Sequence, residues 1–129
     1  MPRTLPQPTI DSITMTTVLA ALADPVRLTL MRAIYRLDGP VDCSTVATGV
    51  DVSAPTVSHH YRVLREAGLT TTVADGRRRI VRVRRDDLEI RFPGLLHAVL
   101  TPDDNYSPPG DTAAVVEERA AGTVGGQRS

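Results

Sequence analysis

The residues that could carry chemistry lie in three places. A histidine pair, His59 and His60, stands inside the stretch SAPTVSHHYRVLREAGL, and a single thiol, Cys43, precedes it. The third place is a set of carboxylates with one histidine: Asp86, Asp87, Glu89 and His97. Imidazoles, thiolates and carboxylates bind metals, and imidazoles also exchange protons and form hydrogen bonds. The spacing of these residues decides which chemistry the chain can support.

Metal chemistry is not favoured at any of the three places. Adjacent residues on a helix point about 100° apart, so the histidine pair cannot close on one ion. A single cysteine, Cys43, can form neither a thiolate metal site nor an internal disulfide. We expect Cys43 to be buried as a small hydrophobic residue and not to act as a thiol sensor. We predict no cofactor and no metal; the carboxylates with His97 are kept as candidates for an irregular Ni²⁺ or Zn²⁺ site.

Enzyme signatures are missing as well. The sequence has no glycine-rich phosphate loop, no nucleophile elbow and no H-E-x-x-H motif, so we predict that the protein is not an enzyme.

The charge pattern is more informative. Every basic residue is arginine, and residues 53–85 contain eight arginines against two acids, although the formal net charge of the chain is zero. Such a block predicts a polyanion partner, with a solvated charged face as the alternative.

The elements around this block follow from helical periodicity and stop signals. Met15, Val18, Leu19 and Leu22 predict a helix over about 13–23. Asp24-Pro25 begins a second helix, which Asp38-Gly39-Pro40 ends. A short helix is expected over 44–48, and Ser53 is the N-cap of the next helix, 54–67, which Gly68 ends. Two helices joined in this way form a helix-turn-helix.

After Leu69 the pattern alternates, as in strands. Segments 70–74 and 79–84 flank Asp75-Gly76, a strong hairpin signal, and form a basic two-stranded wing. The last helical segment, about 86–100, is broken near Arg91 or Phe92, with Pro93 expected in the first turn of the helix that follows.

The length of 129 residues suits one domain. We predict a mainly α fold with a two-stranded β-hairpin, a dimeric winged helix-turn-helix. The domain spans 12–100, between a flexible N-terminal arm, 1–11, and a disordered acidic tail, 101–129. No apolar run is long enough for a membrane span and no signal peptide is recognisable, so we expect a cytoplasmic protein.

A helix-turn-helix with a basic wing is suited to DNA. The helix fits the major groove, where it reads base edges, and wing arginines reach phosphates. Burying Val57, Tyr61 and Leu64 leaves one set of side chains facing outward: Thr56, Ser58, His59 and Arg62. We predict that these residues, with Arg77, Arg78 and Arg79 of the wing at 75–79, bind double-stranded operator DNA. His60 is expected to be a structural histidine.

The element order and the strings ALADPVRLTLM, VSAPTVSHHYRVLREAGL and DGRRRIVRVR resemble the arsenic-repressor-like (ArsR-type) winged-helix regulators over about residues 13–100. The resemblance implies a homodimeric repressor that releases operator DNA when an effector binds, and His60 matches the recurrent histidine of the family. Both usual metal sites are absent. Cysteine-using members carry C-V-C where this chain has Asp42, Cys43 and Ser44, and zinc-type members carry histidines where it has Glu89 and Leu100.

We predict that the chain dimerises through the N-terminal helix and the C-terminal segment, because these two segments carry more apolar side chains than one small core can bury. The side chains assigned to the dimer interface are Met15, Leu19, Leu22, Phe92, Leu95, Leu96 and Val99. The operator should then be an inverted repeat. Two alternatives stay open. One is a winged-helix protein-interaction module acting with a partner regulator, and the other is a metal-responsive repressor with a non-standard site.

Overall fold

A computed structural model describes residues 1–101; the predicted acidic tail, apart from Thr101, lies outside the described residues. The chain forms, in order, β1 (Arg3–Thr4), the 3-10 helix η1 (Ile10–Ser12), α1 (Met15–Leu22), α2 (Pro25–Leu37), β2 (Val41–Asp42), α3 (Cys43–Ala47), α4 (Ala54–Glu66), β3 (Thr70–Asp75), β4 (Arg78–Val83), α5 (Arg85–Arg91) and α6 (Leu95–Leu100). Within residues 1–101 no helix is both long and apolar enough to cross a membrane.

The helix starts are set by the side chains that the sequence indicates. Asp24 Oδ1 accepts hydrogen bonds from the amides of Val26 and Arg27, at 2.8 and 3.1 Å, and Pro25 follows as the first residue of α2. These amide bonds, that of Arg27 first, lower the pKa of Asp24. Ser53 Oγ accepts from the amide of Thr56 at 3.4 Å and caps α4. The predicted helix-turn-helix, α3 followed by α4, is confirmed.

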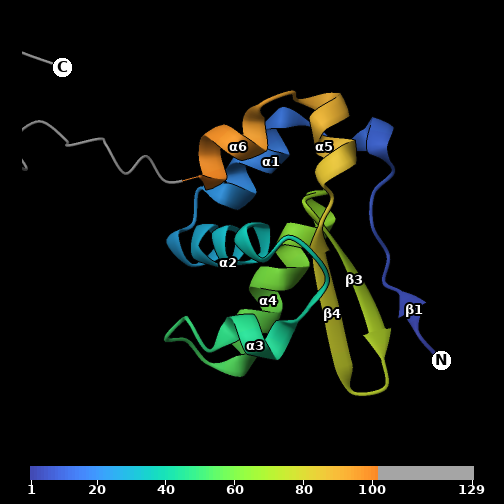
Figure 1. The fold of residues 1–129 in the computed structure, drawn as a ribbon, viewed down its shortest axis with the longest axis vertical. Helices are drawn as coiled ribbons and strands as arrows, with labels where there is room; N and C mark the ends of the chain where they lie inside the picture. Colours follow the sequence, from blue (N-terminus) through green and yellow to red (C-terminus); the bar gives the residue numbers. More distant parts are fainter. Residues whose placement is uncertain (102–129) are drawn as a thin grey trace, which may run out of the picture.

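The predicted hairpin is also confirmed, and the sheet is larger than the hairpin. Strands β3 and β4 pair antiparallel from Thr70↔Val83 to Asp75↔Arg78, so the turn consists of Gly76 and Arg77, with Gly76 at φ 63°. The short strands β1 and β2 extend the hairpin to a four-stranded antiparallel sheet in the order β1-β3-β4-β2. In Figure 1 the hairpin runs from the helical body down past α4, with β1 at its outer edge.

The N-terminal segment differs from the expected flexible arm. Arg3 and Thr4 pair with Ala74 and Val73 of β3. Arginine side chains from the body of the domain also donate to carbonyl oxygens of this segment, including Arg65 Nε to Pro6 at 3.0 Å and Arg84 Nη1 to Pro8 at 2.8 Å. The backbone groups of this segment find their hydrogen-bond partners in strand β3 and in arginine side chains, and the local sequence pattern does not indicate these partners.

The core lies where α1, α2 and α4 meet β4 and α5 (Figure 1). Val18, Leu30, Leu64, Val81 and Leu88 are completely buried in it. Gly68 ends α4 at φ 90°, and a Cβ at this position would lie 2.6 Å from Cγ1 of the buried Ile13. Both the backbone conformation and the close packing therefore require glycine here.

The C-terminal segment breaks where predicted, but the helix after the break begins at Leu95, later than expected. Helix α5 ends at Arg91, and Gly94, at φ 84°, precedes α6. Pro93 lies in this connection and not in the first turn of α6. Gly94 adopts a left-handed backbone conformation that is closed to proline, so α6 begins after Gly94 and not at Pro93.

Candidate nucleic-acid interface

Helix α4 carries two different faces. Thr56, Ser58, His59 and Arg62 are exposed, whereas Val57, His60, Tyr61 and Leu64 are buried. The exposed side chains are the ones predicted to read DNA. The Thr56 hydroxyl shares a 2.9 Å hydrogen bond with the Ser53 hydroxyl, so part of its capacity belongs to the helix cap. Within residues 1–101, the side chains of Ser58, His59 and Arg62 have no hydrogen-bonding partner, so the outer face of α4 presents unpaired polar groups to solvent.

The buried face fixes α4 to the other helices. Nη1 of Arg27, on α2, lies 3.2 Å from Nδ1 of His60, and Arg27 Nε donates to the Ala21 carbonyl at 2.6 Å. The Tyr61 hydroxyl donates to the carbonyl of Cys43, on α3, at 3.2 Å, and burial raises the pKa of that hydroxyl. His60 is thus a structural histidine, as predicted. It has 8% of its surface exposed, whereas the neighbouring His59 is exposed to solvent.

The three wing arginines are all exposed but are held differently. Arg77 has no partner within residues 1–101. Arg78 Nε forms an ion pair with Asp42 Oδ2 at 3.2 Å, and Arg79 Nη1 donates to the carbonyls of Gly76 and Arg78. Asp42 also caps α3, and its pKa is lowered first by the Ser44 hydroxyl bond and then by the Ser44 amide and Arg78. The ion pair ties the wing to the start of the helix-turn-helix.

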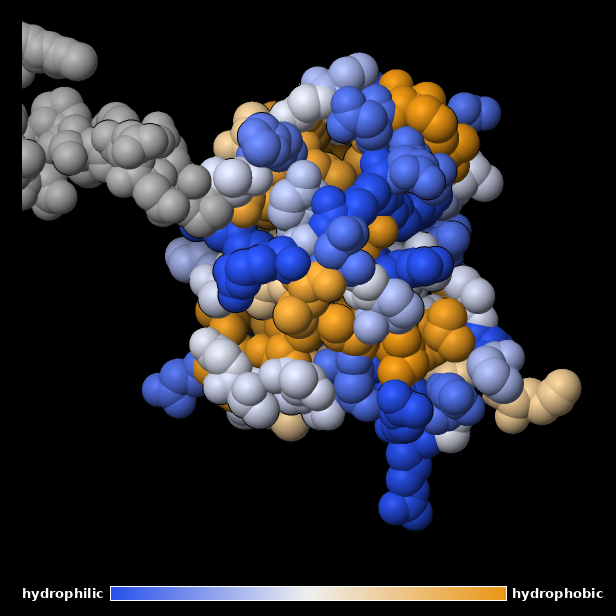
Figure 2. Space-filling model, viewed as in Figure 1, coloured by the Kyte–Doolittle hydropathy of each residue, from blue (hydrophilic) through white to orange (hydrophobic). Residues whose placement is uncertain are grey.

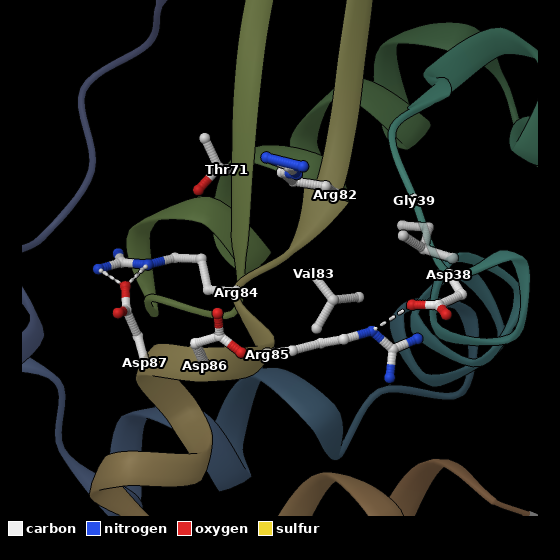
Figure 3. A pocket seen from close by; sticks show the side chains of 10 residues that line it. Asp38, Gly39, Thr71, Arg82, Val83, Arg84, Arg85, Asp86 and Asp87 are labelled. Carbon is white, nitrogen blue, oxygen red and sulfur yellow. Dashed lines mark hydrogen bonds and ion pairs between the residues drawn. The ribbon is translucent and has the colours of Figure 1, made fainter.

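The base of the wing encloses a pocket of about 370 Å³ between β4, the start of α5 and the end of α2. Its charged side chains pair largely with one another, as Figure 3 shows. Arg84 binds Asp87 at 2.9 Å, while Arg85 binds Asp38 at 3.0 Å and stacks over the Tyr35 ring at 3.9 Å. Arg84 is buried and also holds the Pro8 carbonyl, so it supports the wing and does not belong to its exposed basic face.

The candidate metal ligands are not brought together. Asp87 is bound by Arg84, Glu89 accepts from the Gly94 amide at 3.2 Å, and His97 Nδ1 lies 3.3 Å from the Thr101 hydroxyl. Within residues 1–101, no three His, Cys, Asp or Glu side chains are grouped so that they could hold an ion. Within this part of the chain, Asp86, Asp87, Glu89 and His97 are therefore not gathered into one such group. Cys43 is half-buried, and burial raises the pKa of its thiol to about 11.

The residues predicted for the dimer interface fall into two groups. Met15 and Leu19 on α1 are 39% and 46% exposed, and Phe92, Leu95 and Val99 are half-buried. Leu22 and Leu96 are buried within the chain itself, at 5% and 4% exposure, so they belong to its core. Figure 1 places α1 and α6 at the same end of the molecule, away from the tip of the wing.

The residues that hold the interface in place are not indicated by the sequence. Arg27 and Arg84 are the clearest cases, since each bonds a residue or carbonyl far away in sequence. The pattern around Arg27 gives no signal for this role. Arg84 carries a weak signal, because it is the first residue after β4 and lies three residues before the acid Asp87.

Comparison with known proteins extends these observations. Residues 22–73 match the helix-turn-helix domain family. The chain is 34% identical over 82 residues to YceK of Bacillus subtilis (strain 168), an HTH-type transcriptional regulator; the match covers 64% of this chain and 82% of that protein. It also resembles the crystal structure of an ArsR family transcriptional regulator at 25% identity and a TM-score of 0.55, over 65% of this chain and 90% of the other. An ArsR-like regulator from Rhodococcus sp. RHA1 gives 26% identity and a TM-score of 0.51, over 65% and 76%.

Proposed function

The chain belongs to the ArsR-type helix-turn-helix transcriptional regulators, and from this premise we propose that it is a homodimeric repressor of an inverted-repeat operator. DNA binding itself follows from the family. The finer proposal is that α4 enters the major groove and that the wing, residues 75–79, contacts the DNA backbone. One observation carries it: α4 is fixed from behind by Arg27 and Tyr61, while its outer face presents unpaired polar side chains.

The chemistry of the outer face supports a division between base reading and phosphate binding. The Ser58 hydroxyl and the His59 imidazole can donate to or accept from base edges, and the Arg62 guanidinium can donate to guanine or to a phosphate. Arg77, Arg78 and Arg79 provide positive charge that does not depend on sequence. We therefore assign specificity to α4 and most of the salt-dependent affinity to the wing.

The homodimer is proposed from the exposed apolar side chains of α1. Met15 and Leu19 are large and solvent-exposed in the single chain, and Phe92, Leu95 and Val99 add half-buried apolar surface. A two-fold dimer would present two α4 helices to successive major grooves, about one helical turn of DNA apart. An exposed apolar patch of this kind marks an interface in soluble proteins.

The assignment of α4 is tested by changing Ser58→Ala and His59→Ala separately. Binding to a duplex that contains the operator is compared with binding to a scrambled duplex, by fluorescence anisotropy at one salt concentration. Each substitution should weaken operator binding by about 1–3 kcal/mol and change binding to the scrambled duplex much less. Equal losses on both duplexes would show that these residues do not read bases.

A further inference from the structure

A groove between α2 and α3 is lined by none of the residues assigned to DNA or to the proposed dimer interface. It has a volume of about 300 Å³ and is lined by Thr29, Leu30, Arg32, Ala33, Arg36, Val46, Gly49 and Val50. The floor is aliphatic, formed by α2, α3 and the connection that follows α3. Figure 2 shows apolar surface over α2 and toward α3, with strongly hydrophilic surface beside it on the side of α6. The volume is at the lower end of the range for small-molecule sites.

Two guanidinium groups line this groove without a carboxylate. Arg32 and Arg36 are four residues apart, one turn of α2, so they lie on the same face and repel each other. Within residues 1–101 neither forms an ion pair, in contrast to Arg78, Arg84 and Arg85. None of the residues that line the groove is acidic. The groove therefore carries two positive charges beside an apolar floor, with no acidic residue among those that line it.

Arg32 also has an unused donor. Its Nη2 donates to the Val99 carbonyl of α6 at 3.2 Å, whereas its Nε is buried and has no acceptor within the described part of the chain. Buried donors are normally satisfied, so an orphaned Nε on a cation needs an explanation. An anionic oxygen bound in the groove would supply the missing charge, and it would accept from Nε once the Arg32 side chain turned toward the groove.

We propose that the groove binds a small organic carboxylate with a short apolar body. The carboxylate would pair with Arg32 and Arg36, since guanidinium groups bind planar carboxylates through charge-assisted hydrogen bonds. The apolar body would lie on Ala33, Val46 and Val50. An inorganic anion would leave this apolar surface exposed, and a neutral apolar molecule would leave the arginines unpaired, so the two halves of the groove specify one class of ligand.

The proposal is tested by isothermal titration of the full chain with hexanoate, in the absence of DNA. Hexanoate should bind saturably, one molecule per chain. Hexanamide, which lacks the charge, and acetate, which lacks the apolar body, should each bind at least about tenfold more weakly. Because no DNA is present, a failure here leaves the proposed DNA-binding function standing.

Variants locate the binding. Arg36→Gln, at an exposed position, should weaken hexanoate binding at least about tenfold, and Ala33→Leu should block it by filling the groove. Circular dichroism checks that both variants fold. If the Ala33→Leu variant is unfolded, the affinity of the Arg36→Gln variant alone decides the test. Arg3→Gln removes an exposed guanidinium on β1 and should leave binding unchanged.

Several results would overturn the proposal. They are equal affinity for hexanoate and hexanamide, equal affinity for hexanoate and acetate, unsaturable binding, or no effect of Arg36→Gln.

Discussion

At the scale of single residues, the two adjacent histidines have separate surroundings. His59 points to solvent on the outer face of α4, and His60 is buried against α2, where Nδ1 lies 3.2 Å from the Arg27 guanidinium. A hydrogen bond from a cation to Nδ1 requires that this nitrogen carry no proton, so His60 acts as an acceptor. The pair therefore combines one side chain available to DNA with one that holds the recognition helix in position.

This separation predicts that the two histidines contribute unequally to the stability of the fold. His60→Ala should lower the free energy of unfolding by about 2 kcal/mol, because the Arg27 guanidinium loses its acceptor and a cavity forms. His59→Ala, the matched control one residue away, should change it by less than about 0.5 kcal/mol. Urea unfolding followed by circular dichroism measures both. Equal effects of the two substitutions would contradict the structural role of His60.

The thiol of Cys43 gives a prediction about pH. Burial raises its pKa from the ordinary 9.0 to about 11, so at pH 8 the folded chain should contain about a hundredfold less thiolate than the unfolded chain. Alkylation by iodoacetamide at pH 8 should be slower by a similar factor in the native protein than in urea. It should accelerate as the pH approaches 11. A native rate equal to the rate in urea would refute the burial effect.

At the scale of elements, the wing has one free arginine and two that are already engaged. Arg78 pairs with Asp42 and Arg79 contacts carbonyls of the turn, whereas Arg77 has no partner within residues 1–101. The pairing holds the hairpin against the start of α3 and so fixes the wing relative to α4. Arg78 must give up part of this ion pair if it is to bind a phosphate.

The wing assignment predicts a change in salt dependence. Arg77→Ala should reduce the slope of log K against log salt by about 1, and replacing all three wing arginines should reduce it by about 2–3. Arg77→Lys, which keeps the charge, is the matched control and should keep the slope. The measurement is binding to a random duplex over a salt series. A slope unchanged in the triple variant would remove the wing from the DNA interface.

The elements could be predicted from the sequence because their signals are local. Asp24-Pro25, Ser53 and Gly68 mark helix ends through contacts within a few residues, and the alternation after Leu69 marks the hairpin. The two-residue strand β1 is too short to show a pattern, and it forms because the edge of β3 offers backbone partners. The partnership of Arg27 and His60 joins residues 33 positions apart, and no local signal indicates it.

The candidate interface was predicted more completely than the apolar surfaces. Thr56, Ser58, His59 and Arg62 are exposed as expected, since burying one stripe of an amphipathic helix determines the opposite face. Leu22 and Leu96 were predicted for the dimer interface but are buried in the core. A helical stripe is the same whether it packs within a chain or against a second copy, so periodicity could not separate Leu22 from Leu19.

At the scale of the whole molecule, the proposed dimer determines how the DNA is read. Helix α1, which carries Met15 and Leu19, lies at the end of the molecule away from the wing tip, so a two-fold interface there would leave both α4 helices and both wings free. The spacing of the half-sites is then a property of the interface and not of α4 alone. A single chain would read only one half-site, with correspondingly lower specificity.

The central claim is that a dimer of this chain reads an inverted repeat through α4. Repeated selection of duplexes from a random-sequence library by the purified protein, followed by sequencing, tests it most directly. We predict enrichment of an inverted repeat whose half-sites are about 10 base pairs, or about 34–36 Å, apart. Enrichment of a single unrepeated half-site would contradict the dimer, and no enrichment at all would contradict sequence-specific DNA binding and favour a protein-interaction module.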